Sequence, residues 1–165
     1  MALSTFLLTI LAGIAGTVIM TATMYLYARL SKANTKVVHV LGEMLTGNVR
    51  DSSSEKRKML TVGTIGHFAV GVMFSLLYFL LWNWGYFQIT LIDSLIIGAV
   101  SGSVAIIGWK FYLTMHQNPP KASFKHYAIA LLISHVVFGV VTVICFQIIT
   151  DNPEFWYQMK EELEG

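Results

Sequence analysis

Four long apolar stretches alternate with short polar segments along the chain. They run from Leu3 to Ala28, Thr61 to Trp82, Thr90 to Leu113 and Tyr127 to Thr150. A helix needs about 20 residues to cross the hydrocarbon core of a bilayer. Because each stretch reaches that length, the pattern predicts an all-α, polytopic membrane protein with four transmembrane helices in one domain, residues 1–150.

Two further elements are expected outside these spans. Residues 35–46 have an amphipathic pattern, with Asn34 or Thr35 as a plausible N-cap and Gly47 as a stop. We expect a short interfacial helix here, followed by a mobile polar loop from Asn48 to Lys58. Residues 151–165 form an acidic tail with aromatic side chains, which is typical of a membrane-surface element.

The two halves of the chain are similar to each other. Residues of about 8–82 and 90–150 can be aligned so that Gly16 corresponds to Gly102 and a His-x-x-x-Gly unit recurs at His67 and His135. Each half contains two crossings, so the halves should be parallel repeats related by an axis along the membrane normal. This predicts two equivalent hairpins with both histidines at similar depth.

Composition supports the membrane class and charge predicts the topology. Of 165 residues, 55% are hydrophobic and 12% charged, and the mean hydropathy is +0.64. Ten of the 11 basic residues lie in or beside the loops at 29–60 and 114–126. The positive-inside rule makes these loops cytoplasmic and both termini external, as in a bacterial inner-membrane protein. Topology explains the basic clusters, so no nucleic-acid partner is expected.

Small residues recur at helical spacing within the predicted spans. Stripes of this kind let helix backbones approach closely in lipid. We therefore expect helix packing at Gly13, Gly16, Thr17, Gly63, Gly98 and Gly102.

The intramembrane histidines His67 and His135 are the main candidates for function. A buried imidazole needs a hydrogen-bond partner, and a structural bond across helices to a threonine, a serine or a carbonyl is the simplest role. The alternative is a haem b held by both histidines, since two imidazoles at equal depth suit bis-histidine ligation. In that case Gly71 and Gly139 would leave space beside the porphyrin.

Two other interpretations of the histidines stay open. Methionines could add soft ligands for Cu(I), although methionine is also ordinary core filler; the methionines concerned are Met20, Met24, Met73 and Met115. A small transporter or proton path is the second, because ionisable residues within a membrane are functional candidates.

The sequence contains no arrangement typical of a named enzymatic reaction. Ser-His-Asp order, a phosphate-binding loop and paired carboxylates are all missing. We therefore expect a non-enzymatic accessory or interaction subunit without a resident cofactor, which contacts membrane lipids and a protein partner or a second copy of itself.

Three motifs resemble those of a family of small, uncharacterised bacterial membrane proteins with four helices. They are Leu11-Ala12-Gly13-x-x-Gly16-Thr17-x-x-Met20-Thr21, Gly66-His67-Phe68-x-x-Gly71-x-x-Phe74 and His135-x-x-Phe138-Gly139. The resemblance covers most of residues 11–146. It implies the four-helix fold and a shared core at the motif positions, and it implies no activity.

Overall fold

A computed structural model describes residues 3–47, 52–115, 119 and 123–150 and contains five helices within them. These are α1 (Leu3–Ser31), α2 (Val37–Thr46), α3 (Ser53–Asn83), α4 (Leu91–Met115) and α5 (Phe124–Thr150). Four of them, α1, α3, α4 and α5, are long and apolar enough to cross a membrane. The predicted all-α, membrane-spanning fold is therefore confirmed.

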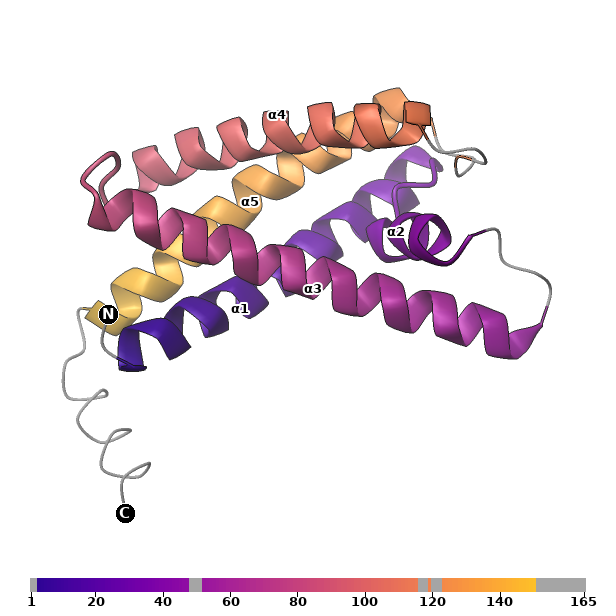
Figure 1. Cartoon of the computed structure of the whole chain (residues 1–165). Coiled ribbons are helices and arrows are strands. Elements are labelled where there is room, and N and C mark those ends of the chain that lie inside the picture. The colour runs from indigo at the N-terminus through magenta and orange to yellow at the C-terminus, as the bar shows by residue number, and fades with distance from the viewer. Residues whose placement is uncertain (1–2, 48–51, 116–118, 120–122, 151–165) are drawn as a thin grey trace, which may run out of the picture.

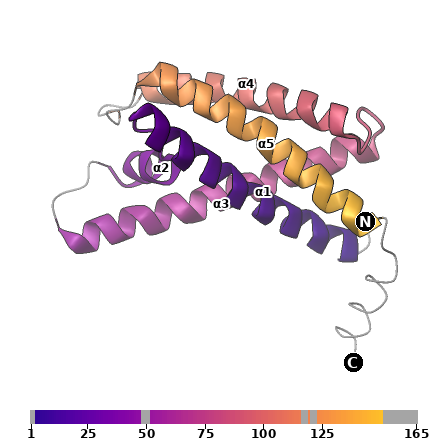
Figure 2. The same ribbon diagram turned by 180° about the vertical axis from the view of Figure 1, so that it is seen from behind.

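The long helices form an open ring rather than a closed bundle. Helix α1 packs against both α3 and α5, and α5 packs in turn against α4 (Figures 1 and 2). The two views place the start of α1 beside the end of α5, far from α2. Helices α3 and α4 approach each other only sparsely, so the ring has a seam between them.

Helix α2 packs against α3 through glycines. A Cβ on Gly42 would collide with the backbone of Met59, and one on Gly63 with the carbonyl oxygen of Val38. The helix begins after Lys36, not after Asn34 or Thr35 as expected. The reason is that the Thr35 hydroxyl is buried and donates to the carbonyl oxygen of Met24 at 2.9 Å. Gly47 ends the helix with a φ of 82°, as its position predicts.

The predicted mobile loop before α3 is wrong for its second half. Residues 53–58 are helical, and the Ser52 hydroxyl accepts from the backbone N–H of Glu55 at 3.3 Å. Ser52-x-x-Glu55 is a capping-box sequence, which starts the helix well before the apolar stretch. Residues 48–51 and the tail at 151–165 lie outside the described residues.

The contacts of the two hairpins do not confirm the repeat. In the α1–α3 pair, Gly71 lies against Thr17. The alignment by eye would place Ser103 against Gly139 in the α4–α5 pair. Gly139 instead lies against Ser94 and Gly98, and Ser103 is exposed. The second hairpin therefore has another register, roughly one and a half to two and a half turns away from the proposed equivalence.

Candidate binding cavity

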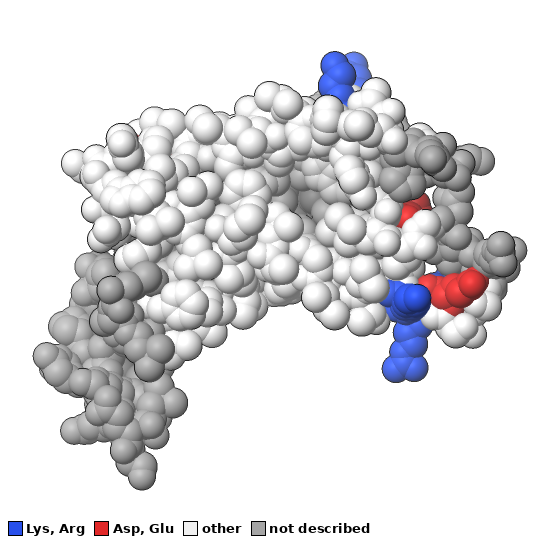
Figure 3. All heavy atoms as spheres, in the orientation of Figure 1, with Lys and Arg blue, Asp and Glu red and all other residues white. Residues whose placement is uncertain are grey.

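A cavity of about 430 Å³ lies at the seam between α3 and α4. The space-filling view shows the surface hollowed between these two helices (Figure 3). All five helices contribute to its wall, and both predicted histidines are among the lining residues. The rest of the lining is apolar or aromatic and comprises Met20, Val37, Leu41, Leu45, Val70, Gly71, Phe74, Ala105, Gly108, Trp109, Tyr112, Leu131 and Phe138.

His67 reaches the cavity from α3 and is held by α1. Its Nε2 lies 3.0 Å from the Thr21 hydroxyl oxygen, and that hydroxyl donates its own proton to the Thr17 carbonyl at 2.6 Å. A hydroxyl has one proton to give, so Thr21 accepts from His67 and Nε2 carries the hydrogen. In the neutral imidazole, Nδ1 is then the lone-pair nitrogen.

His135 reaches the same cavity from α5 with the opposite tautomer. Its Nδ1 lies 2.8 Å from the carbonyl oxygen of Leu131, which can only accept, so Nδ1 carries the hydrogen and Nε2 the lone pair. The Phe74 ring packs edge-on against the imidazole at a centroid distance of 5.5 Å. On the side facing α4, Gly98 and Gly102 let that helix approach the backbone and Cβ of His135.

The depths of the two histidines can be compared through their positions along α1, which packs against both α3 and α5. His67 meets α1 at Thr21. On the other side, Gly16 lies against Phe138 and Tyr27 bonds His126. These two antiparallel pairs place His135 beside the segment just before Thr21, within one turn of the level of His67. The histidines therefore lie at similar depth, although the contact register of their hairpins differs.

The space beside the two glycines predicted to make room for a porphyrin is filled by other residues of the protein. A Cβ on Gly71 would collide with the Thr17 hydroxyl, and one on Gly139 would lie 2.5 Å from the Ser94 carbonyl oxygen. Gly71 borders the cavity, whereas Gly139 faces α4.

The other predicted packing residues also lie at helix interfaces within the chain. Gly13 lies against Ser75 and Val72, and Gly16 against Phe138 and Thr142. Gly63 meets α2, while Gly98 and Gly102 meet α5. These small-residue faces are therefore covered by the chain's own helices.

The four methionines do not gather around the histidines. Met20 lines the cavity and Met24 is buried, while Met73 and Met115 are exposed. Among the described residues, no group of three or more His, Cys, Asp or Glu side chains is placed to hold a metal ion.

Sequence reasoning missed two aromatic residues of the cavity wall, Trp109 and Tyr112 of α4. It named Phe74 of α3 only as a core position of a motif, not as part of a site. The available signal was their spacing, since Trp109 and Tyr112 are three residues apart and Phe74 is seven residues from His67, so each pair shares a helix face.

Two histidines outside the cavity join the helices at the basic end of the molecule. The Tyr27 hydroxyl lies 3.1 Å from Nδ1 of His126, and the Tyr25 hydroxyl lies 3.2 Å from Nδ1 of His39. Burial lowers the pKa of His39 below its ordinary value of 6.5, and nearby Lys36 lowers it further, while Glu43 acts in the opposite direction. The lowered pKa favours the neutral form of His39 in the α1–α2 contact.

The fold and the cavity define a small, all-α membrane-spanning protein with two histidines in an apolar internal site. The chain belongs to a family of unknown function, DUF6789, which matches residues 3–157. No curated protein and no solved structure matches the chain. The predicted membership of an uncharacterised family is therefore confirmed, and the function has to be argued from the site.

Proposed function

We propose that this protein is a non-enzymatic accessory protein of the membrane that binds a small, apolar, hydroxyl-bearing molecule in the cavity between α3 and α4. The observation that carries the proposal is the shared cavity of His67 and His135. Each imidazole has one nitrogen bonded to the protein and a second that is left as an acceptor.

The size and lining of the cavity support a ligand rather than a packing defect. Ligand pockets have volumes of about 300–1,000 Å³ and combine apolar walls with a few polar groups that fix orientation. The volume of the cavity, about 430 Å³, falls within this range. The titratable residues in its lining are the two histidines and Tyr112. Such a lining favours an apolar guest over a hydrated path for ions or protons.

The tautomers indicate which polar group the guest carries. Nδ1 of His67 and Nε2 of His135 are both lone-pair nitrogens, so they accept hydrogen bonds. Neither has a hydrogen-bond partner among the described residues. An alcohol or a phenol supplies the matching O–H donor, whereas a ketone or an ester does not.

Binding without chemistry is the simplest use of this site. The lining contains no carboxylate, serine or cysteine beside the histidines, and general acid–base or nucleophilic catalysis depends on such partners. An accessory role, in which the protein holds or presents a lipid-soluble molecule, requires the cavity alone.

We also propose the bacterial inner membrane as its location, with the α2 end cytoplasmic. Charged side chains gather at that end in the space-filling view (Figure 3). Because the small-residue faces are covered internally, a protein partner or a second copy would meet the exposed apolar face of α4, which includes Ile92, Val100, Val104 and Ile107.

Solvent extraction of the purified protein tests the proposed function. Protein purified in mild detergent from the membranes of its native cells should yield about one molecule of an apolar, hydroxyl-bearing compound for each protein chain. The double variant His67→Leu, His135→Leu should lose it, while Met73→Leu, an exposed change of similar size, should retain it. Recovery of bulk lipid alone, equally from all three proteins, would contradict the proposal.

A bis-histidine haem b is a second candidate, supported by two imidazoles at similar depth on one cavity. Nε2 of His135 is available to an iron, but Nε2 of His67 is bonded to Thr21. Ligation by both Nε2 atoms therefore requires that the Thr21 bond be given up. A Soret band in protein made with ample haem, altered by His67→Ala and by His135→Ala, would establish this candidate.

A further inference from the structure

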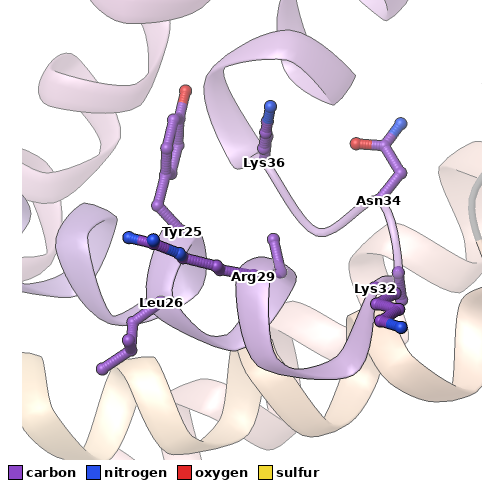
Figure 4. A pocket seen from close by; sticks show the side chains of 8 residues that line it. Tyr25, Leu26, Arg29, Lys32, Asn34 and Lys36 are labelled. Carbon is purple, nitrogen blue, oxygen red and sulfur yellow. The ribbon is translucent and has the colours of Figure 1, made fainter.

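A second hollow, of about 750 Å³, lies where α1 ends and the chain turns toward α2 (Figure 4). Three cationic side chains line it, together with Tyr25 and Asn34, and its lining contains no carboxylate. The cations are Arg29, Lys32 and Lys36. This basic pocket is separate from the histidine cavity and shares no lining residue with it.

The basic pocket brings three cations together without an acidic residue in its lining. Among the described residues, no carboxylate forms an ion pair with Arg29, Lys32 or Lys36. Figure 4 shows the polar ends of Tyr25, Asn34 and Lys36 extending to the same side, with Arg29 and Lys32 on either side of the helix end. Three like charges around one hollow repel each other, and an anion bound there relieves this repulsion.

The backbone that carries these side chains is anchored on both sides of the turn. Thr35 bonds the Met24 carbonyl at 2.9 Å, and the Ala33 N–H donates to the Ser31 hydroxyl at 3.3 Å. Tyr25 is fixed by its contact with His39 at 3.2 Å. The pocket is thus a preformed feature of the fold, which lowers the entropic cost of binding.

The position of the pocket indicates an amphiphilic guest. Helix α1 is apolar enough to cross a membrane over Phe6–Ser31, so its last residues reach the bilayer surface. Leu26, which lines the pocket, is 58% exposed, and Leu30 is 76% exposed. An anion bound at Arg29 and Lys32 would therefore have an apolar helix surface directly beside it.

We propose that the basic pocket binds the phosphate headgroup of an anionic phospholipid, whose acyl chains lie along Leu26 and Leu30. Arginine forms two parallel hydrogen bonds with a phosphate, and lysines add compact charges. The same phosphate chemistry would also suit free phosphate. The exposed leucines favour the lipid, and the two sources can be separated by experiment.

The test is native mass spectrometry of the full chain in detergent, titrated with phosphatidylglycerol, phosphatidylcholine or inorganic phosphate. We expect the wild-type protein to retain one phosphatidylglycerol and to show little affinity for phosphatidylcholine. The variant Arg29→Gln, Lys32→Gln, Lys36→Gln should bind phosphatidylglycerol at least about tenfold more weakly. Circular dichroism verifies that the variant is helical.

A matched control removes the same charge elsewhere. The control is the triple variant Lys56→Gln, Arg57→Gln, Lys58→Gln. These residues lie in the first turns of α3 and outside the basic pocket, so phosphatidylglycerol binding should change by less than about twofold. Should the pocket variant fold poorly, Arg29→Lys keeps the charge but loses the paired hydrogen bonds, and it should still weaken binding.

Three results would overturn the proposal. Equal weakening in the pocket variant and the control would mean that general charge attracts the lipid. Unchanged binding in the pocket variant, with Arg29→Lys also unchanged, would place the lipid elsewhere. Displacement of phosphatidylglycerol by low millimolar phosphate would assign the basic pocket to soluble phosphate.

Discussion

The interfaces of α1 and the seam between α3 and α4 are packed in opposite ways. Along α1, glycines on one helix receive hydroxyl or aromatic side chains from the next, as Gly71 receives Thr17 and Gly16 receives Phe138. At the seam, Gly108 of α4 has no atom within 4 Å of an added Cβ. Small residues close the first interface, whereas at the second they border a cavity.

The comparison shows that the effect of a small residue in a membrane helix depends on how closely the neighbouring helix approaches it. Where the neighbouring helix crosses closely, glycine permits contact and contributes to stability. Where the neighbouring helix diverges, as α3 does from α4, the missing side chain of a glycine adds to the space of the cavity. The difference predicts that equivalent substitutions will have opposite effects on the two regions.

The largest expected effect comes from Gly71→Ala. The new Cβ would collide with the Thr17 hydroxyl, which is itself held by the Gly13 carbonyl at 2.6 Å and has little freedom to move. Overpacking of this kind costs about 2 kcal/mol of unfolding free energy. Reversible unfolding in mixed micelles measures this loss, and an unchanged free energy would mean that the α1–α3 contact is loose.

Breaking the hydrogen bond between Tyr78 of α3 and Ser101 of α4, which crosses the seam, should cost less. The Tyr78 hydroxyl lies 2.6 Å from the Ser101 hydroxyl, and Ser101 also bonds Gly98 at 3.0 Å. Tyr78→Phe should therefore lower the unfolding free energy by about 1 kcal/mol. Thermal unfolding in detergent measures it, with Tyr86→Phe as the comparison variant because Tyr86 is exposed. Equal losses in the two variants would argue against a specific role for Tyr78.

Gly108→Ala should stabilise the protein slightly. Open space surrounds the new methyl group, and alanine is favoured over glycine within a helix by about 0.5–1 kcal/mol. The same unfolding assay as for Gly71→Ala gives the sign directly. Destabilisation by Gly108→Ala would show that the space around Gly108 is filled.

The smallest expected effect is a pH dependence at the α1–α2 contact. Burial and Lys36 lower the pKa of His39 below 6.5, so the unfolded chain binds a proton at a pH where the folded chain does not. The contribution of His39 is then complete above about pH 6.5 and is lost as the pH falls below it. Stability measured from pH 7.5 to 5 should fall less in His39→Gln than in the wild type.

The spans were predictable because a membrane crossing leaves a strong, local signal in sequence. The helix ends were harder to predict. Ser52 and Glu55 are a capping signal for α3, but the polar composition of the segment indicated a loop instead. Thr35 bonds the carbonyl of Met24, which lies too far away in sequence for a local pattern to indicate it. The family membership was predicted from motifs and is confirmed.

The sequence pointed to both histidines of the candidate site and to Gly71, but not to the aromatic wall that α4 supplies. His67 and His135 stand out because ionisable residues are rare in lipid, and the expected bond across helices is present at His67. Trp109 and Tyr112 resemble any lipid-facing aromatic until the divergence of α3 from α4 is known. The register of α4 on α5 depends on side-chain packing along the whole interface, so alignment of the halves by eye did not give it.

The intact mass of the protein tests the central claim, a ligand in the histidine cavity, most directly. Native mass spectrometry of protein from its own membranes should show the chain mass plus one small apolar compound. Gly108→Leu, which fills open space on the cavity wall, should give a folded protein at its bare mass. A bare wild-type mass, or an adduct that persists in Gly108→Leu, would contradict the account.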